Sequence, residues 1–110
     1  MKRRTALKLA AASLVAGSLA IGTAQAGDTV KIGAVAPKTG PLAGGSTVTH
    51  WPNIHLWVHE VNARGGLKLK DGRKKIELIE YDDQTNPGVH IKAAQRLATQ
   101  DKVDFIVAPY

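Results

Sequence analysis

The sequence of 110 residues contains no cysteine. Within these residues, disulfide frameworks, thiolate metal sites, lipid anchors on a thiol and thiol catalysis are therefore all excluded. No serine has an obvious histidine base, so no hydrolase arrangement is indicated either. The sequence thus predicts neither an enzyme nor a bound cofactor.

The sequence also has little excess charge of one sign once its first residues are set aside. The formal net charge is +6, but four of the 15 basic residues lie within the first eight positions. The other 11 basic residues stand against 9 acidic ones, a near balance that does not indicate a nucleic-acid partner. Hydrophobic residues make up 44% of the sequence, which favours the packed core of one small domain.

The apolar run near the start is too short to span a membrane. This run, Leu9–Ile21, is only weakly apolar, whereas a hydrocarbon core of ~30 Å requires about 20 residues. Basic residues precede it, and Ala-Gln-Ala at 24–26 offers the small side chains that signal peptidase recognises. The pattern predicts a secretory signal peptide over residues 1–26, cleaved after Ala26, and a periplasmic mature chain. Arg3-Arg4 leaves open whether the export machinery is the twin-arginine or the general one.

From Val30 onward, short apolar runs alternate with helical patterns. The expected strands cover residues 30–36, 75–81 and 103–108, and the expected helices cover residues 52–63 and 87–100. The basic segment 64–75 is expected to be a solvated connector. The β-α-β-α-β order predicts an α/β fold with a parallel sheet and helices on both faces. The expected spatial order is flavodoxin-like, with the first strand between the second and the third.

Both expected helices have recognisable ends and faces. Thr47 or Thr49 is the expected cap of the first helix, with Pro52 in its first turn and Gly65-Gly66 at its end. Asn86 is the expected cap of the second helix, and Pro87 follows at its first position. The residues expected to face inward are Ile54, Trp57, Val58 and Val61 in the first helix, and Ile91, Ala94, Leu97 and Ala98 in the second.

The glycine-rich segment 39–46, interpreted as a loop, is the expected functional centre. Ligands of parallel α/β sheets bind at the carboxyl ends of strands, and this segment follows the first strand. Its glycine spacing is like that of a phosphate-binding loop, but Ser46 stands where the required lysine should be. A nucleotide site is therefore not expected. Backbone N–H groups of the segment can still hold a carboxylate, and the alternative is a plain strand–helix turn.

Several side chains outside this segment could take part in chemistry, but a structural role is favoured for each. His55 and His59 could share a metal, yet no third ligand is placed, so a solvated polar face is expected. Asp82 and Asp83 are adjacent and point to opposite sides of an extended backbone, so they are expected to form a turn. Trp51 could lie over a ligand, although a core position is favoured.

Four stretches of the sequence resemble the amino-terminal lobe of periplasmic branched-chain amino acid (leucine-type) binding proteins, which are substrate-binding components of ABC transporters. These stretches are KIGAVAPKTGPLAGG, EVNARGGL, IELIEYDDQTNP and QRLATQDKVDFIVAP. They occur in the family's order and with matching spacing over almost all of residues 30–110. The resemblance implies that residues 27–110 begin the first lobe of a two-lobed protein that closes on a small ligand. A complete member is far longer, so a fragment is expected.

The resemblance also implies a site and a function. In the family, the loop after the first strand lines the ligand cleft, which implies ligand contacts from Thr39, Gly40, Leu42, Ala43, Gly44, Gly45 and Ser46. The segment after the third strand contributes too, and here it begins at Tyr110. The implied role is to bind an amino acid or amide for a transporter permease, without catalysis. A sensor lobe of the same fold is the alternative, and an enzyme of flavodoxin-like layout is the third hypothesis.

Overall fold

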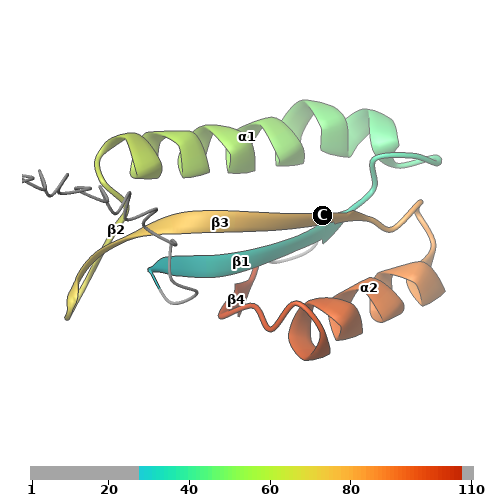
Figure 1. The fold of residues 1–110 in the computed structure, drawn as a ribbon. Helices are drawn as coiled ribbons and strands as arrows, with labels where there is room; N and C mark the ends of the chain where they lie inside the picture. The colour runs from blue at the N-terminus through green and yellow to red at the C-terminus, as the bar shows by residue number, and fades with distance from the viewer. Residues whose placement is uncertain (1–27, 108–110) are drawn as a thin grey trace, which may run out of the picture.

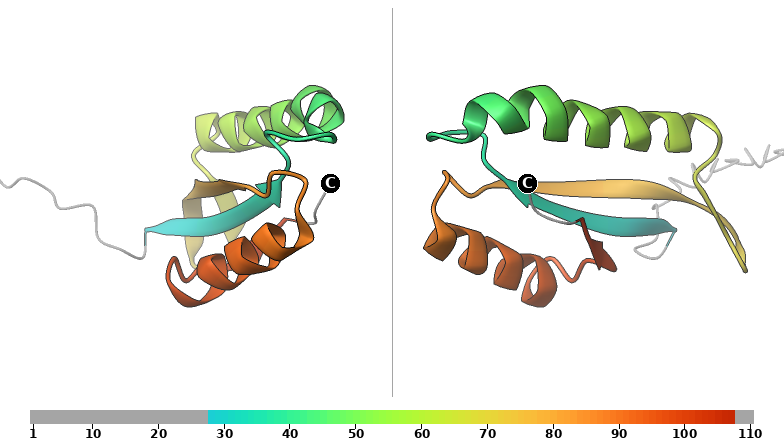
Figure 2. Two further views of the ribbon diagram at one scale, coloured as in Figure 1. Left: turned by 90° about the vertical axis from the view of Figure 1, so that its right-hand side faces the viewer. Right: turned by 180° about the vertical axis from the view of Figure 1, so that it is seen from behind.

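The computed structural model describes residues 28–107. Within that range, two helices cover opposite faces of a four-stranded sheet (Figures 1 and 2). The elements in chain order are β1 (Thr29–Ala36), α1 (Ala43–Ala63), β2 (Leu67–Leu69), β3 (Gly72–Asp82), α2 (Pro87–Thr99) and β4 (Phe105–Ile106). The expected signal peptide and Tyr110 lie outside the described residues.

The sheet has the order β2-β3-β1-β4, and β1 is parallel to both of its neighbours. The predicted α/β fold, with the first strand between the second and third, is therefore confirmed. The sequence did not predict β2, which lies inside the segment expected to be a connector. β2 pairs antiparallel with the start of β3. A strand of three residues is too short to show the alternation by which strands are recognised in a sequence. The third predicted strand is shorter than expected, at Phe105–Ile106.

β1 forms the centre of the core because it lies between β3 and β4. Successive side chains of a strand point to opposite faces, so alternate residues of β1 share one face. On the face toward α1, these residues are Val30, Ile32, Ala34 and Ala36, all of them buried. The residues of α1 that pack into the same clusters are Trp51, Ile54 and Val61. The small alanines lie in one cluster with Trp51, where a large indole ring needs room.

The opposite face of β1 packs against α2 through Gly33 and Leu97. Leu97 is fully buried. A Cβ atom on Gly33 would lie only 2.7 Å from Leu97 Cδ1 and 2.9 Å from Leu97 Cδ2. Gly33 is therefore required by packing, because α2 sits so close to the strand that its leucine fills the space of a side chain.

The predicted start of the first helix is wrong, because α1 begins at Ala43 and Pro52 lies inside it. Thr47 and Thr49 do not cap the helix; each hydroxyl donates to the carbonyl four residues earlier, of Ala43 and Gly45 respectively. Glycine pairs are poor helix formers, but tertiary contacts can override that preference. Here the contacts are made by Ser46 Oγ and Trp51 Nε1, which both donate to the carbonyl of Pro37.

The other helix ends agree with the sequence. At the end of α1, Gly65 and Gly66 take positive φ angles of 96° and 106°, and the Gly66 N–H donates to the Val61 carbonyl. At the start of α2, the Asn86 side chain accepts hydrogen bonds from the N–H groups of Gly88 and Val89.

The apolar stripes on both helices are narrower than predicted. Three residues expected to face inward are exposed, namely Trp57 (40% exposed), Ile91 (57% exposed) and Ala98. Each lies beside the stripe that touches the sheet, which runs through Trp51, Ile54 and Val61 in α1 and through Leu97 in α2. A helix that meets a sheet along one line buries only that line, so the flanking apolar residues face outward. Neither helix of residues 28–107 is long and apolar enough to cross a membrane.

Replacing Gly33 with alanine is expected to lower the free energy of unfolding by about 1–3 kcal/mol, because the new methyl group overlaps Leu97. Denaturant unfolding followed by circular dichroism measures this loss. In a Leu97→Ala background, which itself costs about 2–5 kcal/mol, the same substitution should cost much less because the space is vacated.

Gly44→Ala is the matched control for that substitution. A Cβ on Gly44 meets nothing within 4 Å, and alanine in a helix is favoured over glycine by about 0.5–1 kcal/mol. The control should therefore be neutral or stabilising. Equal losses for Gly33→Ala in the two backgrounds would contradict the packing argument.

Candidate functional site

Two loops meet at the carboxyl ends of the parallel strands. The first loop, residues 37–42, joins β1 to α1, and the second loop, residues 83–86, joins β3 to α2. Thr85 links them through its hydroxyl, which donates to the Thr39 carbonyl (3.1 Å) and accepts from the Leu42 N–H (3.2 Å). The two loops, which lie at the same end of the sheet in Figure 1, are therefore joined into one connected edge by Thr85.

The Asp82 carboxylate joins the first loop to the end of β3. Asp82 Oδ1 accepts hydrogen bonds from the N–H groups of Lys38 (2.7 Å), Thr39 (3.2 Å) and Gln84 (2.8 Å). Asp82 Oδ2 accepts from the Thr39 hydroxyl at 2.7 Å. The sequence predicted a turn-forming role, which the bond to Gln84 confirms, but missed the bonds to the first loop. The pairing of β1 with β3 is the signal that could have indicated these bonds. It places Asp82 directly beside Ala36, the last residue of β1, and therefore beside the start of the first loop.

These hydrogen bonds set the charge state of Asp82. Desolvation raises the pKa of this carboxyl group, but donated hydrogen bonds from Lys38, Thr39 and Gln84 outweigh it and lower the pKa to about 2. The group is therefore ionised at neutral pH, and its four hydrogen bonds are made to a charged acceptor.

The second loop has a strained backbone where it lies against the first loop. Gln84 and Thr85 have positive φ angles of 57° and 58°, which are rare for a β-branched residue such as threonine. Asp83, on the same loop, accepts from the Thr85 N–H at 2.9 Å and stabilises this conformation. Gly40 approaches so closely that a Cβ there would lie 2.6 Å from the Gln84 carbonyl oxygen, and its own φ is +86°. The close backbone approach thus occurs at Gly40, whereas Gly44 and Gly45 are helical.

The predicted ligand-binding residues divide by exposure. Those that lie at the solvent-exposed surface are Thr39, Gly40, Leu42 and Gly44, while Ala43 and Gly45 are half-buried. Ser46 is fully buried, and its hydroxyl donates to the Pro37 carbonyl. That serine therefore holds α1 against the first loop, and its side chain does not reach the surface.

A groove of about 330 Å³ lies between the two loops and the start of α2. Its apolar lining comes from Pro37, Leu42, Pro87 and Ile91, and its polar lining includes Asp83 and His90. His90 Nδ1 lies 2.8 Å from Asp83 Oδ2, so the two polar side chains are paired with each other. The groove offers apolar contact and a fixed shape, and the described residues bring no nucleophile with a base to it.

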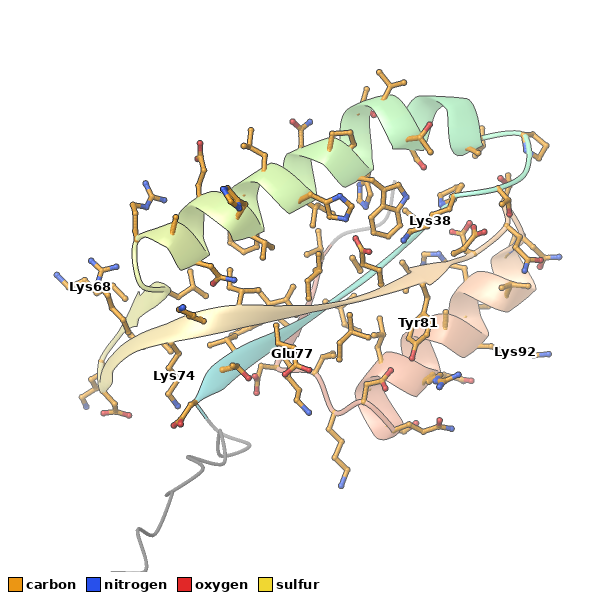
Figure 3. The ribbon with its side chains drawn as sticks, turned by 45° about the horizontal axis from the view of Figure 1, so that its top comes forward. Lys38, Lys68, Lys74, Glu77, Tyr81 and Lys92 are labelled. Carbon is orange, nitrogen blue, oxygen red and sulfur yellow. The ribbon has the colours of Figure 1, made fainter. Side chains whose placement is uncertain are left out.

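A second cluster holds the first loop against α1. Lys38, which is labelled in Figure 3, has its Nζ 3.2 Å from Glu80 Oε2 and 4.4 Å from the centre of the Trp51 ring. His55 Nε2 contacts Glu80 from the helix. Trp51 is buried, so its predicted core position is confirmed. Although desolvation raises the pKa of Glu80, hydrogen bonds from His55 and Lys38 lower it overall. Among residues 28–107, no group of three potential ligands is placed to hold a metal.

Known proteins resemble this chain in sequence and in fold. Residues 29–110 match the family described as periplasmic binding protein. The isoleucine complex of the branched-chain amino acid transporter substrate binding protein LivJ from Streptococcus pneumoniae is 33% identical, with a TM-score of 0.65, over 74% of this chain and 22% of that one. The complex of an ABC transporter solute binding protein from Rhodopseudomonas palustris with 3,4-dihydroxybenzoic acid is 31% identical, with a TM-score of 0.51, over 72% and 20%. The chain spans about a fifth of the length of each.

Asp82→Asn is expected to lower the free energy of unfolding at neutral pH by about 1–3 kcal/mol, because an amide replaces one of the two acceptor oxygens with a donor. The folded-state pKa of about 2 lies below the ordinary value of 3.8, so the stabilisation is present above that ordinary value and is lost as the pH falls toward 2. The difference between the two proteins should therefore shrink over that range.

Unfolding curves at a series of pH values measure this difference. Asp71→Asn is the control, since Asp71 is an exposed residue of the hairpin turn whose side chain makes no hydrogen bond or ion pair with residues 28–107. It removes the same charge and should change stability little at any pH. A loss for Asp82→Asn that stays constant down to pH 2 would show that the carboxylate does not hold the loops through its charge.

Proposed function

Because the chain belongs to the periplasmic binding protein family, we propose that it forms part of the first lobe of the substrate-binding component of an ABC transporter, specific for branched-chain or related amino acids. Members of this family bind ligands rather than transform them. The observation that carries the proposal is the rigid edge formed by the two loops at the carboxyl ends of β1 and β3. Such an edge is where ligands of parallel α/β sheets bind.

The proposed ligand class is supported by the chemistry of this edge and of the similar proteins. Isoleucine and 3,4-dihydroxybenzoic acid, which are bound by the two similar proteins, both combine a carboxylate with an apolar body. In this chain, the first turn of α1 carries no acidic residue and its N-cap, Leu42, offers no side-chain acceptor. The backbone N–H groups of Gly44 and Gly45 are therefore suited to a ligand carboxylate, while the exposed Leu42 side chain suits the apolar body.

The proposed ligand-binding residues are Thr39, Gly40, Leu42, Ala43, Gly44 and Gly45, together with Tyr110 beyond the described range. Ser46 has a supporting role in this proposal because its side chain is buried against the Pro37 carbonyl. The transporter permease is the proposed partner of the complete protein. The family's periplasmic character also supports the proposal that residues 1–26 are a signal peptide and that the mature chain acts in the periplasm.

The proposed export is tested at the amino terminus of the protein. Mass spectrometry of the chain recovered from the periplasm of an expressing bacterium should show Gly27 as the first residue, because Ala24 and Ala26 provide the small side chains that signal peptidase needs. An intact Met1 on the exported protein would contradict cleavage after Ala26.

The proposed binding edge is tested with Gly40→Ala in the complete protein encoded by the source gene. Alanine at a positive φ costs about 1–3 kcal/mol, and its methyl group would also press on the Gln84 carbonyl. We expect isothermal titration calorimetry with isoleucine, leucine and 3,4-dihydroxybenzoic acid to find at least one tight ligand, and the variant to bind it about 10–100-fold more weakly. The 110-residue chain alone should bind none of them tightly, because it supplies one wall of the cleft.

Gly65→Ala is the matched control. Gly65 has a similar φ of +96°, but it lies at the far end of α1, and its nearest neighbour would be a flexible arginine side chain at 3.5 Å. It should therefore lose the stability that a positive φ costs, without the added clash, and keep the wild-type affinity. Equal loss of affinity in both variants would place the binding site elsewhere, and the absence of any ligand among the three would count against the proposed ligand class.

A further inference from the structure

The hairpin formed by β2 and the start of β3 concentrates positive charge. Residues 64–75 include one acidic residue, Asp71, and six basic ones, namely Arg64, Lys68, Lys70, Arg73, Lys74 and Lys75. The register places this hairpin beside the amino end of β1, since Lys75 pairs with Thr29. We call it the basic hairpin. It therefore lies at the end of the sheet opposite the two loops of the candidate site (Figure 1).

The tertiary structure adds two further lysines to this end of the molecule. Lys31 of β1 and Lys102, before β4, line one groove of about 630 Å³ together with Lys74 of the basic hairpin. The acidic residue in this groove is Asp104, whose carboxylate accepts a hydrogen bond from the Lys31 backbone N–H at 2.8 Å. Among residues 28–107, the ion pairs involve Lys38, His55 and His90 and none of these lysines. Their ammonium groups are thus available to an external anion.

The rest of the described chain has the opposite sign. Outside residues 64–75, the described residues contain eight acidic and five basic side chains. Three of the acidic ones, Glu80, Asp82 and Asp83, lie at or next to the loops of the candidate site. Figure 3 shows Lys68 and Lys74 at one end of the strands and Lys92 at the other. Asp28 and Glu77 lie beside the basic hairpin, since Thr29 pairs with Lys75 and its hydroxyl donates to Glu77. Residues 64–75 still carry six basic side chains against one acidic one, and such an uneven charge distribution orients a protein in front of a charged surface.

We propose that the basic hairpin and its groove dock on the surface of an anionic lipid bilayer. The hairpin is rich in lysines, whose long stems allow the ammonium groups to reach lipid phosphates. Leu69, at the end of β2, is 40% exposed among them and can enter the headgroup region. Thr29, near the amino end of the mature chain expected after cleavage, lines the same groove.

The proposal rests on the proposed export but not on the proposed ligand. It is tested with the exported protein, by sedimentation with vesicles of phosphatidylcholine alone or mixed with about one third phosphatidylglycerol. The protein should sediment with the anionic vesicles and be released as salt rises to about 0.5 M, because screening weakens the attraction. Lys68→Glu should lower the partition coefficient by about tenfold or more, since each lysine near an anionic surface contributes about fivefold.

Lys92→Glu makes the same charge change on an exposed position of α2, at the other end of the strands, and should leave partitioning within about threefold of the wild type. Circular dichroism checks that both variants fold, and Lys70→Glu replaces Lys68→Glu if the latter does not.

Equal losses for the two sites, or equal sedimentation with neutral vesicles, would overturn the proposal. Capture by immobilised polyglutamate without binding to anionic vesicles would also overturn it and indicate an acidic protein partner. Unchanged ligand calorimetry in Lys68→Glu separates this outcome from a failure of the proposed binding function.

Discussion

The arrangement of the candidate site depends on one half-buried carboxylate, that of Asp82. Four hydrogen bonds converge on its two oxygens, and three of them come from the first loop, which lies more than forty positions earlier in the chain. Parallel strands are connected by long crossovers, so the loops that follow β1 and β3 are far apart in the sequence. Here a side chain, that of Asp82, links them. The charged acceptor makes this joint stronger than neutral hydrogen bonds would, and its low pKa keeps it charged.

The carbonyl of Pro37 makes a second joint, between the first loop and α1. Pro37 comes directly after the last residue of β1, so its carbonyl lies outside the sheet ladder. The carbonyl accepts hydrogen bonds from both the Ser46 hydroxyl and the Trp51 indole. A buried carbonyl must be satisfied, so the helix is held at a fixed distance from the strand end. Together with the Lys38 ammonium over the Trp51 ring, these contacts hold the first loop of the candidate site against α1.

Local patterns predicted the elements whose causes are local. Asn86 caps α2 through its own side chain, and Gly65 and Gly66 end α1 through positive φ angles that other residues rarely adopt. The start of α1 was predicted wrongly because Gly44 and Gly45 favour a loop when judged alone, and their neighbours' contacts with Pro37 decide otherwise. The exposed Trp57 shows the same limit, since periodicity identifies an apolar side of a helix but not the width of the stripe that a sheet covers.

The sequence by itself determined the α/β order, the strand at the centre of the sheet and the family, because these follow from apolar spacing, turn residues and recurring stretches. Only the tertiary structure decided which glycine the site requires. Gly40, rather than Gly44 or Gly45, meets the Gln84 carbonyl, a contact between residues far apart in the chain. The tertiary structure also places Lys31, Lys74 and Lys102, which are far apart in the sequence, along one groove. Secondary-structure propensity depends on a few neighbouring residues. These contacts instead join distant residues and form only when β1 pairs in parallel with β3 and β4.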